Sequence, residues 1–306
     1  MRHFILLLLV SAGFSSCSED FLSQTLTIDP PEYEKQFVLH GFGSNLDTTF
    51  KISLTQNFGI LETVADSAWA VKNATVEIFE GGQKLAMLNV APDNPKSYQA
   101  QVMPGFFEPG KTYELRASHP DFPTVTSRQT MPDPVDVDSV RFRQKAGIDP
   151  DGSNLSAIDV FLNDKAGVEN FYEIRLAILT PNLEFNYDSL GNVIVDTIGY
   201  SYYAVSITDS DDPNAQITYG DGIVVNDRFF DGQSYKFVAK FYESYGYTYQ
   251  VFMRAVTEEY YLWSLSAQRK YNADDNPLAE PVTTYTNLDK GIGAFGLAHE
   301  QRFEVK

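Results

Sequence analysis

Apolar and polar residues alternate through most of the chain, which is the pattern of strands that bury one face of a sheet. The alternation is strict over residues 75–79, and Gly81-Gly82 then predicts a two-residue turn into a returning strand over 83–88. Similar runs, separated by turns rich in Gly, Pro and Asn, continue from Phe37 to Ser127. About seven such strands in about 95 residues predict an immunoglobulin-like β-sandwich, although the cysteine pair of true immunoglobulin domains is absent.

A second strand-rich region follows a stiff, proline-containing break at residues 131–138. Its predicted strands cover 139–143, 157–162, 171–179, 193–198, 203–207, 235–242 and 248–256, with long loops between some of them. Tyr261, Leu262 and Leu265 fall near helical spacing and predict one helix from Glu258 to about Tyr271. The chain is therefore predicted to be mainly β, with the sandwich over 36–131 and an antiparallel β domain with a short helix over 132–306.

The first residues follow a different pattern. A short basic start is followed by an apolar run over residues 4–10, which is too short to span a bilayer and is typical of a secretory signal. Small residues then lead to Cys17, the only cysteine of the chain. This arrangement resembles the lipobox of bacterial lipoproteins, in which the cysteine is lipidated and the signal is cut before it. We therefore expect a signal peptide over 1–16 and a lipidated tether over 17–35; an ordinary signal peptide that contains a cysteine is the alternative.

Ser18, Glu19 and Asp20 follow this cysteine directly. A serine and acidic residues at this place resemble the lipoprotein export signal of Bacteroidota. The resemblance implies a protein anchored to the outer membrane by lipid and facing the cell exterior. Acidic residues gain nothing from anionic headgroups, so the acyl chains alone must hold the protein to the membrane. The alternative is an acidic linker without a sorting role.

Charge and composition exclude several functions. The chain has 306 residues, with 41 acidic against 23 basic side chains and a net charge of −18, so a nucleic acid would be repelled. One cysteine and four histidines leave little material for a zinc site. Residues 149–154 and 209–214 supply the oxygen ligands that calcium prefers, but without EF-hand spacing. Their Asp, Asn, Pro and Gly residues are also standard turn formers, so we expect no metal and no other cofactor.

Catalytic motifs are missing from the sequence. It contains neither a Gly-x-Ser-x-Gly elbow nor a His-Glu-x-x-His pair, and carboxylate pairs are too numerous for any one to be chosen as a glycosidase dyad. We expect no catalytic residue and no enzymatic activity. The glycine run at 291–296 lacks the strand–turn–helix context of a nucleotide site. It predicts a bulge or tight turn around a packed Phe295, before a terminal strand over 301–305.

Tyrosines gather at residues 200–203 and 241–249, around predicted loops. Tyrosine combines a large rigid ring with a polar tip, which suits protein interfaces and stacking on sugars. Tyr202, Tyr245 and Tyr247 are therefore the candidate interface residues. The alternative is a tyrosine-rich pair of strands that faces a partly solvated sheet.

Several segments together resemble one family. They are residues 73–76, residues 164–172, the Asn-Asp-Arg-Phe-Phe-Asp-Gly run at 226–232, and the C-terminal run from Asn276 to Gly296. Their order and spacing resemble the Bacteroidota lipoproteins of the domain of unknown function 4249 family, over essentially the whole chain after the signal peptide. The resemblance implies a non-enzymatic protein whose genes often accompany TonB-dependent receptors, and it supplies no catalytic residues.

Two classes of function remain as hypotheses. The first is an accessory subunit of an outer-membrane β-barrel complex, with a TonB-dependent transporter as the preferred barrel. A structural subunit of an outer-membrane protein assembly complex is a variant of this hypothesis. The second is a free glycan-binding module, or a weak hydrolase, at the cell surface. Recovery of a barrel with the protein would favour the first class, and binding to polysaccharides would favour the second.

Overall fold

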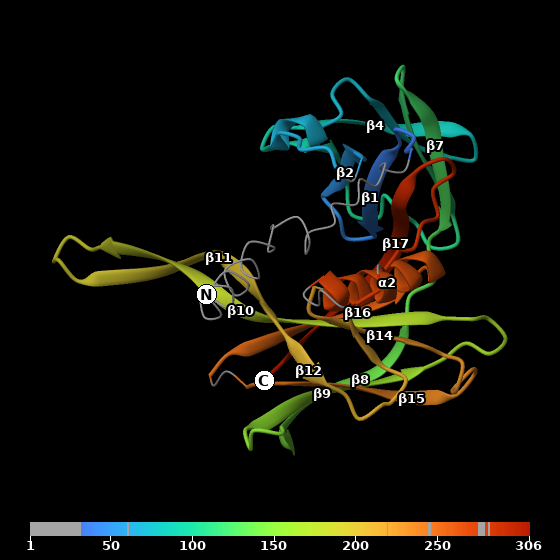
Figure 1. The fold of residues 1–306 in the computed structure, drawn as a ribbon. Helices are drawn as coiled ribbons and strands as arrows, with labels where there is room; N and C mark the ends of the chain where they lie inside the picture. Colours follow the sequence, from blue (N-terminus) through green and yellow to red (C-terminus); the bar gives the residue numbers. More distant parts are fainter. Residues whose placement is uncertain (1–31, 60, 219, 244–245, 275–278, 281) are drawn as a thin grey trace, which may run out of the picture. The chain divides into compact units, whose positions relative to one another are not determined.

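The computed structural model describes residues 32–59, 61–218, 220–243, 246–274, 279–280 and 282–306 (Figure 1). Residues 35–57 and 64–306 form one compact unit, and the following description concerns that unit. Strands account for 58% and helices for 8%, so the predicted class, mainly β with antiparallel sheets and one helix near the C-terminus, is confirmed. No helix among the residues described is long and apolar enough to cross a membrane.

Seventeen strands and two helical segments make up the described chain. The strands are β1 Phe37–Ser44, β2 Thr49–Gln56, β3 Thr75–Glu80, β4 Gln83–Ala91, β5 Asn94–Gln101, β6 Thr112–His119, β7 Phe122–Thr130, β8 Asp136–Ile148, β9 Asn154–Asn163, β10 Phe171–Tyr187, β11 Val193–Val205, β12 Ile207–Asp209, β13 Gln216–Thr218, β14 Gly222–Asn226, β15 Ser234–Phe241, β16 Thr248–Val256 and β17 Ile292–Val305. The helical segments are the 3-10 turn η2 Asp66–Trp69 and the helix α2 Glu258–Asp274, which starts where the sequence predicts.

The N-terminal strands form a sandwich-like arrangement in the order β1-β2-β5-β4-β3-β6-β7. The predicted β3–β4 hairpin is confirmed, and Gly81 and Gly82 both have the positive φ that its two-residue turn requires. Apolar side chains from these strands meet in one core, with Phe50 and Tyr113 fully buried. The core is completed from the far end of the sequence, because Phe295 and Leu297 of β17 pack into it.

A second core lies among β9, β10, β15 and β16. It is enclosed by the antiparallel run β14-β10-β16 and by the four-stranded sheet β12-β15-β9-β8. Its buried residues come from Val135 to Ala255, whereas the first core takes most of its residues from Phe37 to Met131. A division of the chain into two domains at residue 131 stays a prediction.

Strand β17 joins the two sets of strands. Its first half pairs in parallel with β1, and its second half pairs antiparallel with β16. Phe295 is fully buried, as the prediction of a bulge or tight turn around a packed Phe295 requires. From Ile292 onwards, however, the glycine run lies within β17, so the terminal strand starts nine residues earlier than predicted. Gly293 has φ +115°, and an added Cβ would stand 2.0 Å from the carbonyl oxygen of Leu39. The glycine is needed because the backbone of β1 passes too closely for any side chain.

A row of charged side chains crosses the sheet from β10 to β17. Glu173 pairs across the ladder with Arg254, and Arg254 pairs with Glu300. Both carboxylates are nearly inaccessible, and Arg254 Nη1 lies 3.0 Å from Glu173. Tyr260 of α2 donates its hydroxyl to Glu173 at 2.9 Å, and Arg302 contacts Glu300 at 2.7 Å. The row therefore ties the helix and three strands together through buried, paired charges.

Candidate functional site

The longest hairpin of the fold, β10–β11, continues beyond the sheet that supports it (Figure 1). β14 pairs with β10 as far as Arg175, and β16 pairs with it as far as Leu179. From Thr180 to Tyr187, β10 pairs with β11 alone. Eight residues of strand at this point correspond to a ribbon about 27 Å long.

The free part of this hairpin has one apolar and one polar face. Alternate residues of a strand point to opposite faces, and directly paired residues share a face. The pairs Phe185–Val195 and Tyr187–Val193 thus lie on the same face as Leu183. We call these five residues the apolar face; their exposed fractions range from 45% to 72%. The opposite face carries Glu184, Asn186, Ile194 and Asp196.

Such an exposed apolar surface is unusual in a soluble protein and marks a site of interaction. A two-stranded ribbon is also only marginally stable in water by itself, so a covering partner would stabilise it. The base of the ribbon is anchored: the Tyr202 ring packs edge-on against Phe252 with centroids 5.9 Å apart, and the Arg302 guanidinium lies over both rings. The hairpin is therefore packed against the rest of the unit at its base and extends from there as a ribbon.

Two of the predicted interface tyrosines, Tyr202 and Tyr247, lie at the base of this hairpin. Tyr202 is about half exposed, but it lies within β11 and not in a loop as predicted. Its strand pairs with β10 throughout, and the bulge beside Asn182 lets the pairing continue to the turn. Tyr247 is similarly exposed and precedes Thr248, which pairs with Leu179 on the side opposite Tyr202. Tyr245 lies outside the described residues, as do Cys17, Ser18, Glu19 and Asp20.

The apolar face was missed from the sequence because residues 180–192 were predicted as a loop. Pro181 suggests the end of a strand, yet it is tolerated where β10 has a free edge. The alternation Leu183, Phe185, Tyr187 carries the signal that would have extended the strand.

A second cluster consists of three carboxylates, Asp164, Asp227 and Asp231, whose nearest oxygens all lie within 4.8 Å of one another. Asp164 follows β9 and Asp227 follows β14, and both are buried. These are the aspartates of residues 164–172 and 226–232, two of the segments on which the family resemblance rests. The structure brings the two segments together.

Hydrogen bonds hold the two segments to each other. The Tyr172 hydroxyl and the Gly232 amide donate to the two oxygens of Asp164, the latter at 2.8 Å. The Asn170 amide donates to Asp227, and the Gly167 amide donates to Asp231, each at 2.7 Å. Burial raises the pKa of Asp227, and the nearby charge of Asp164 adds to this effect. Three clustered carboxylates are the residues that could hold a cation, but their backbone donors already give them a structural role.

Replacing Asp164 by alanine should lower the free energy of unfolding by about 3 kcal/mol, because the Tyr172 hydroxyl and the Gly232 amide lose their acceptors. Asp231→Ala is the matched control: this residue is exposed and accepts one backbone hydrogen bond, so about 1 kcal/mol is expected. Urea unfolding of both variants measures the difference. Equal losses would show that Asp164 does not hold the segments together.

The two loops with calcium-like composition are built as turns and ion pairs. Asp149 accepts the Ser153 amide at 2.7 Å, which closes its own loop. Asp209 and Asp211 both contact the Lys240 ammonium, at 3.0 and 2.6 Å. Lys240 is thus shared by two carboxylates of the second loop, whereas a backbone hydrogen bond closes the first.

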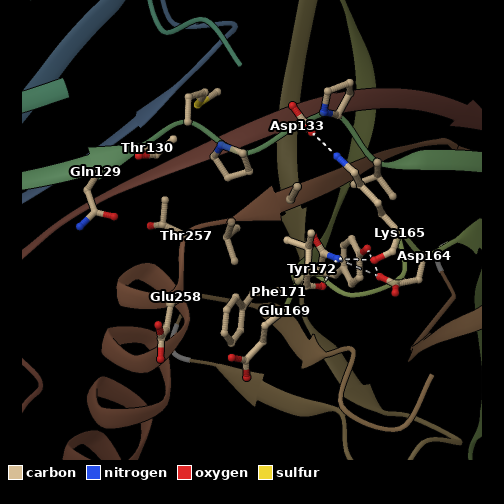
Figure 2. A pocket seen from close by; sticks show the side chains of 18 of the residues that line it. Gln129, Thr130, Asp133, Asp164, Lys165, Glu169, Phe171, Tyr172, Thr257 and Glu258 are labelled. Carbon is tan, nitrogen blue, oxygen red and sulfur yellow. Dashed lines mark hydrogen bonds and ion pairs between the residues drawn. The ribbon is translucent and has the colours of Figure 1, made fainter. Parts of the chain in front are cut away.

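A cleft of about 950 Å³ lies beside the Asp164 cluster. Residues 128–136, 163–165, 168–172 and 255–259 line it, and Figure 2 shows Glu169 and Glu258 on one side and the Lys165–Asp133 ion pair on the other. Among the described residues that line the cleft there is no Ser, Cys or His, so it holds no nucleophile–histidine pair. Its charged residues are mainly acidic, with six carboxylates against Arg128 and Lys165.

Comparison with solved structures gives only distant likenesses. Salmonella alpha-2-macroglobulin reacted with methylamine is 14% identical, with a TM-score of 0.26 over 77% of this chain and 14% of that chain. A DUF4785 family protein from Legionella pneumophila is 9% identical, with a TM-score of 0.23 over 71% of this chain and 51% of that chain. The chain thus spans about half the length of the Legionella protein and about a seventh of the Salmonella protein. Both TM-scores are too low to support a conclusion about the fold. No curated protein matches the sequence.

The family comparison is decisive for membership. The model described as "Domain of unknown function (DUF4249)" matches residues 23–304, which include all the segments whose order and spacing suggested this family. The match thus covers both hydrophobic cores, the β10–β11 hairpin and the Asp164 cluster. This chain belongs to the DUF4249 family.

Proposed function

We propose that this protein is a surface-exposed lipoprotein of the outer membrane and a non-enzymatic accessory subunit of an outer-membrane β-barrel complex. The barrel that we propose is a TonB-dependent transporter. The anchor would be the lipidated Cys17, followed by the export signal Ser18-Glu19-Asp20. The tether that follows would leave the β-rich unit free to contact a neighbour in the membrane.

The observation that carries this proposal is the β10–β11 hairpin. It offers an exposed apolar face on a ribbon that only its base supports. Large exposed apolar surfaces favour a protein or membrane contact over the recognition of a small polar substrate. A subunit role also fits the half-exposed Tyr202 and Tyr247 at the base, since tyrosine is enriched in interfaces.

The test is a mild-detergent purification of the full-length, C-terminally tagged chain, expressed with its own signal in a Bacteroidota host. We expect a TonB-dependent barrel in equal amount, identified by mass spectrometry. Cys17→Ser is the control for anchoring, and we expect this variant to leave the outer-membrane fraction. Recovery of a barrel assembly complex in equal amount would support the variant subunit role instead. Recovery of the chain without any barrel would contradict the proposal.

A further inference from the structure

We propose that the apolar face of the β10–β11 hairpin docks onto an apolar surface flanked by Lys and Arg side chains on the extracellular side of the partner barrel. This inference rests on the proposed function. It adds the element of this chain that makes the contact and the chemistry of the surface that receives it.

Beyond Arg175, the hairpin carries acidic residues and no basic ones. From Arg175 to Arg228 the sequence contains no other Lys or Arg and no His, and the hairpin itself carries Glu184, Asp188 and Asp196. A second copy of this chain would bring the same negative charges together, and an anionic lipid surface would repel them. A basic protein surface would attract them and guide the approach of the hairpin.

Two of these charges oppose each other across the ribbon. Glu184 and Asp196 are directly paired on β10 and β11, an arrangement in which like charges destabilise a sheet. Within the part of the chain that the structure describes, neither carboxylate forms an ion pair; Asp196 accepts a long hydrogen bond of 3.5 Å from Asn186. A cation supplied by a partner would relieve this repulsion, so binding to a basic surface would stabilise the hairpin itself.

The narrow ribbon allows both contacts at once. Two strands are about 10 Å wide including their side chains, so carboxylates on the polar face stay within reach of long Lys or Arg side chains beside the contact. Phe185 and Tyr187, the large aromatic residues of the apolar face, are 62% and 72% exposed. Aromatic side chains that become buried when a complex forms carry most of the binding energy of an interface. The apolar face thus supplies affinity, and the carboxylates select the partner.

The first experiment repeats the purification with two full-length variants, one with three substitutions and one with two. Phe185→Thr with Tyr187→Thr and Val195→Thr removes three of the five residues of the apolar face, including both aromatic rings, while keeping residues that favour strands. Asn186→Thr with Ile194→Thr is the control on the opposite face. We expect the first variant to retain about a tenth or less of the barrel and the control to retain it fully. Both should keep the thermal midpoint of the wild type, because the substituted side chains are exposed.

The outcomes separate this inference from the proposed function. A wild-type chain that recovers no barrel contradicts both. A wild-type chain that recovers the barrel, together with an apolar-face variant that recovers it equally well, contradicts the inference and leaves the function standing. Purified wild type that forms a dimer, or that floats with vesicles of phosphatidylethanolamine and phosphatidylglycerol, also overturns it if the apolar-face variant loses that property.

The second experiment tests the charge. Raising NaCl from about 0.05 M to about 0.5 M shortens the Debye length about threefold, so recovery of the barrel with the wild type should fall. Glu184→Gln with Asp196→Asn should bind more weakly at low salt and respond less to added salt. An unchanged salt response in this variant would show that the partner surface is not basic at these positions.

Discussion

Replacing Gly293 by alanine is expected to destabilise the protein by more than about 4 kcal/mol. Two independent effects act at this position. The backbone has φ +115°, which residues with a side chain rarely adopt, and the added Cβ would lie 2.0 Å from the Leu39 carbonyl oxygen. To avoid this clash, β1 and β17 would have to separate, although seven consecutive residue pairs hold them in parallel register.

Gly199→Ala is the matched control for this prediction. Gly199 also lies in a strand, but a Cβ there would meet only the Asn182 side chain at 3.7 Å, an ordinary contact. We expect a change within about 0.5 kcal/mol. Chemical unfolding of both variants gives the comparison, and a Gly293→Ala protein as stable as Gly199→Ala would show that the β1–β17 contact is looser than described.

Replacing Arg254 by methionine should cost about 3–5 kcal/mol, because it leaves two buried carboxylates without their shared partner. Glu173 and Glu300 both contact this guanidinium, Glu173 at 3.0 Å, and both are almost fully buried. The matched control is Lys51→Met, which removes an exposed pair with Asp93 and should cost about 1 kcal/mol or less. Similar losses in the two variants would contradict a buried row of paired charges.

Acid should act differently on the wild type and on this variant. Burial opposes ionisation of Glu300, but Arg254 and Arg302 outweigh it and hold its pKa below the ordinary value of 4.5. The stability contributed by this lowered pKa is therefore present above pH 4.5 and is lost as the pH falls through the folded-state pKa. In Arg254→Met the main positive charge beside Glu300 is gone, so burial should let this carboxyl group take up a proton at a higher pH than in the wild type. The stability deficit of the variant relative to the wild type should therefore shrink as the pH falls from about 7 to about 4. Urea unfolding over this range measures it, and a constant deficit would contradict the mechanism.

Much of the fold follows from local patterns. The β3–β4 hairpin was predictable because strict alternation and Gly81-Gly82 both act over a few residues. The helix α2 was predictable for the same reason, and it extends to Asp274 because Gln268–Asn272 and Lys270–Asp274 contacts at i, i+4 spacing support the last turn. The short strand β14 was not predicted, since five residues give too little periodicity.

The long-range features could not be predicted. The parallel pairing of β17 with β1 joins segments more than 250 residues apart, and nothing in either segment specifies the other. For this reason the glycine run at 291–296 was interpreted as a turn: its need for a close neighbour is visible only when Leu39 is placed beside Gly293. The contact between Asp164 and Gly232 is of the same kind. Motif order pointed to the family, whereas geometry shows what the motif residues do.

The place of β17 between β1 and β16 has a consequence for how the molecule is made. The N-terminal core needs Phe295 and Leu297, and Asn45 donates to and accepts from the backbone of Glu300. During synthesis from the N-terminus, this core therefore stays unfinished until β17 has been made. Such long-range closure is slow, and it favours a late, concerted folding step over stepwise folding during synthesis. Folding of the N-terminal core is thereby coupled to the synthesis of a strand more than 250 residues further along the chain.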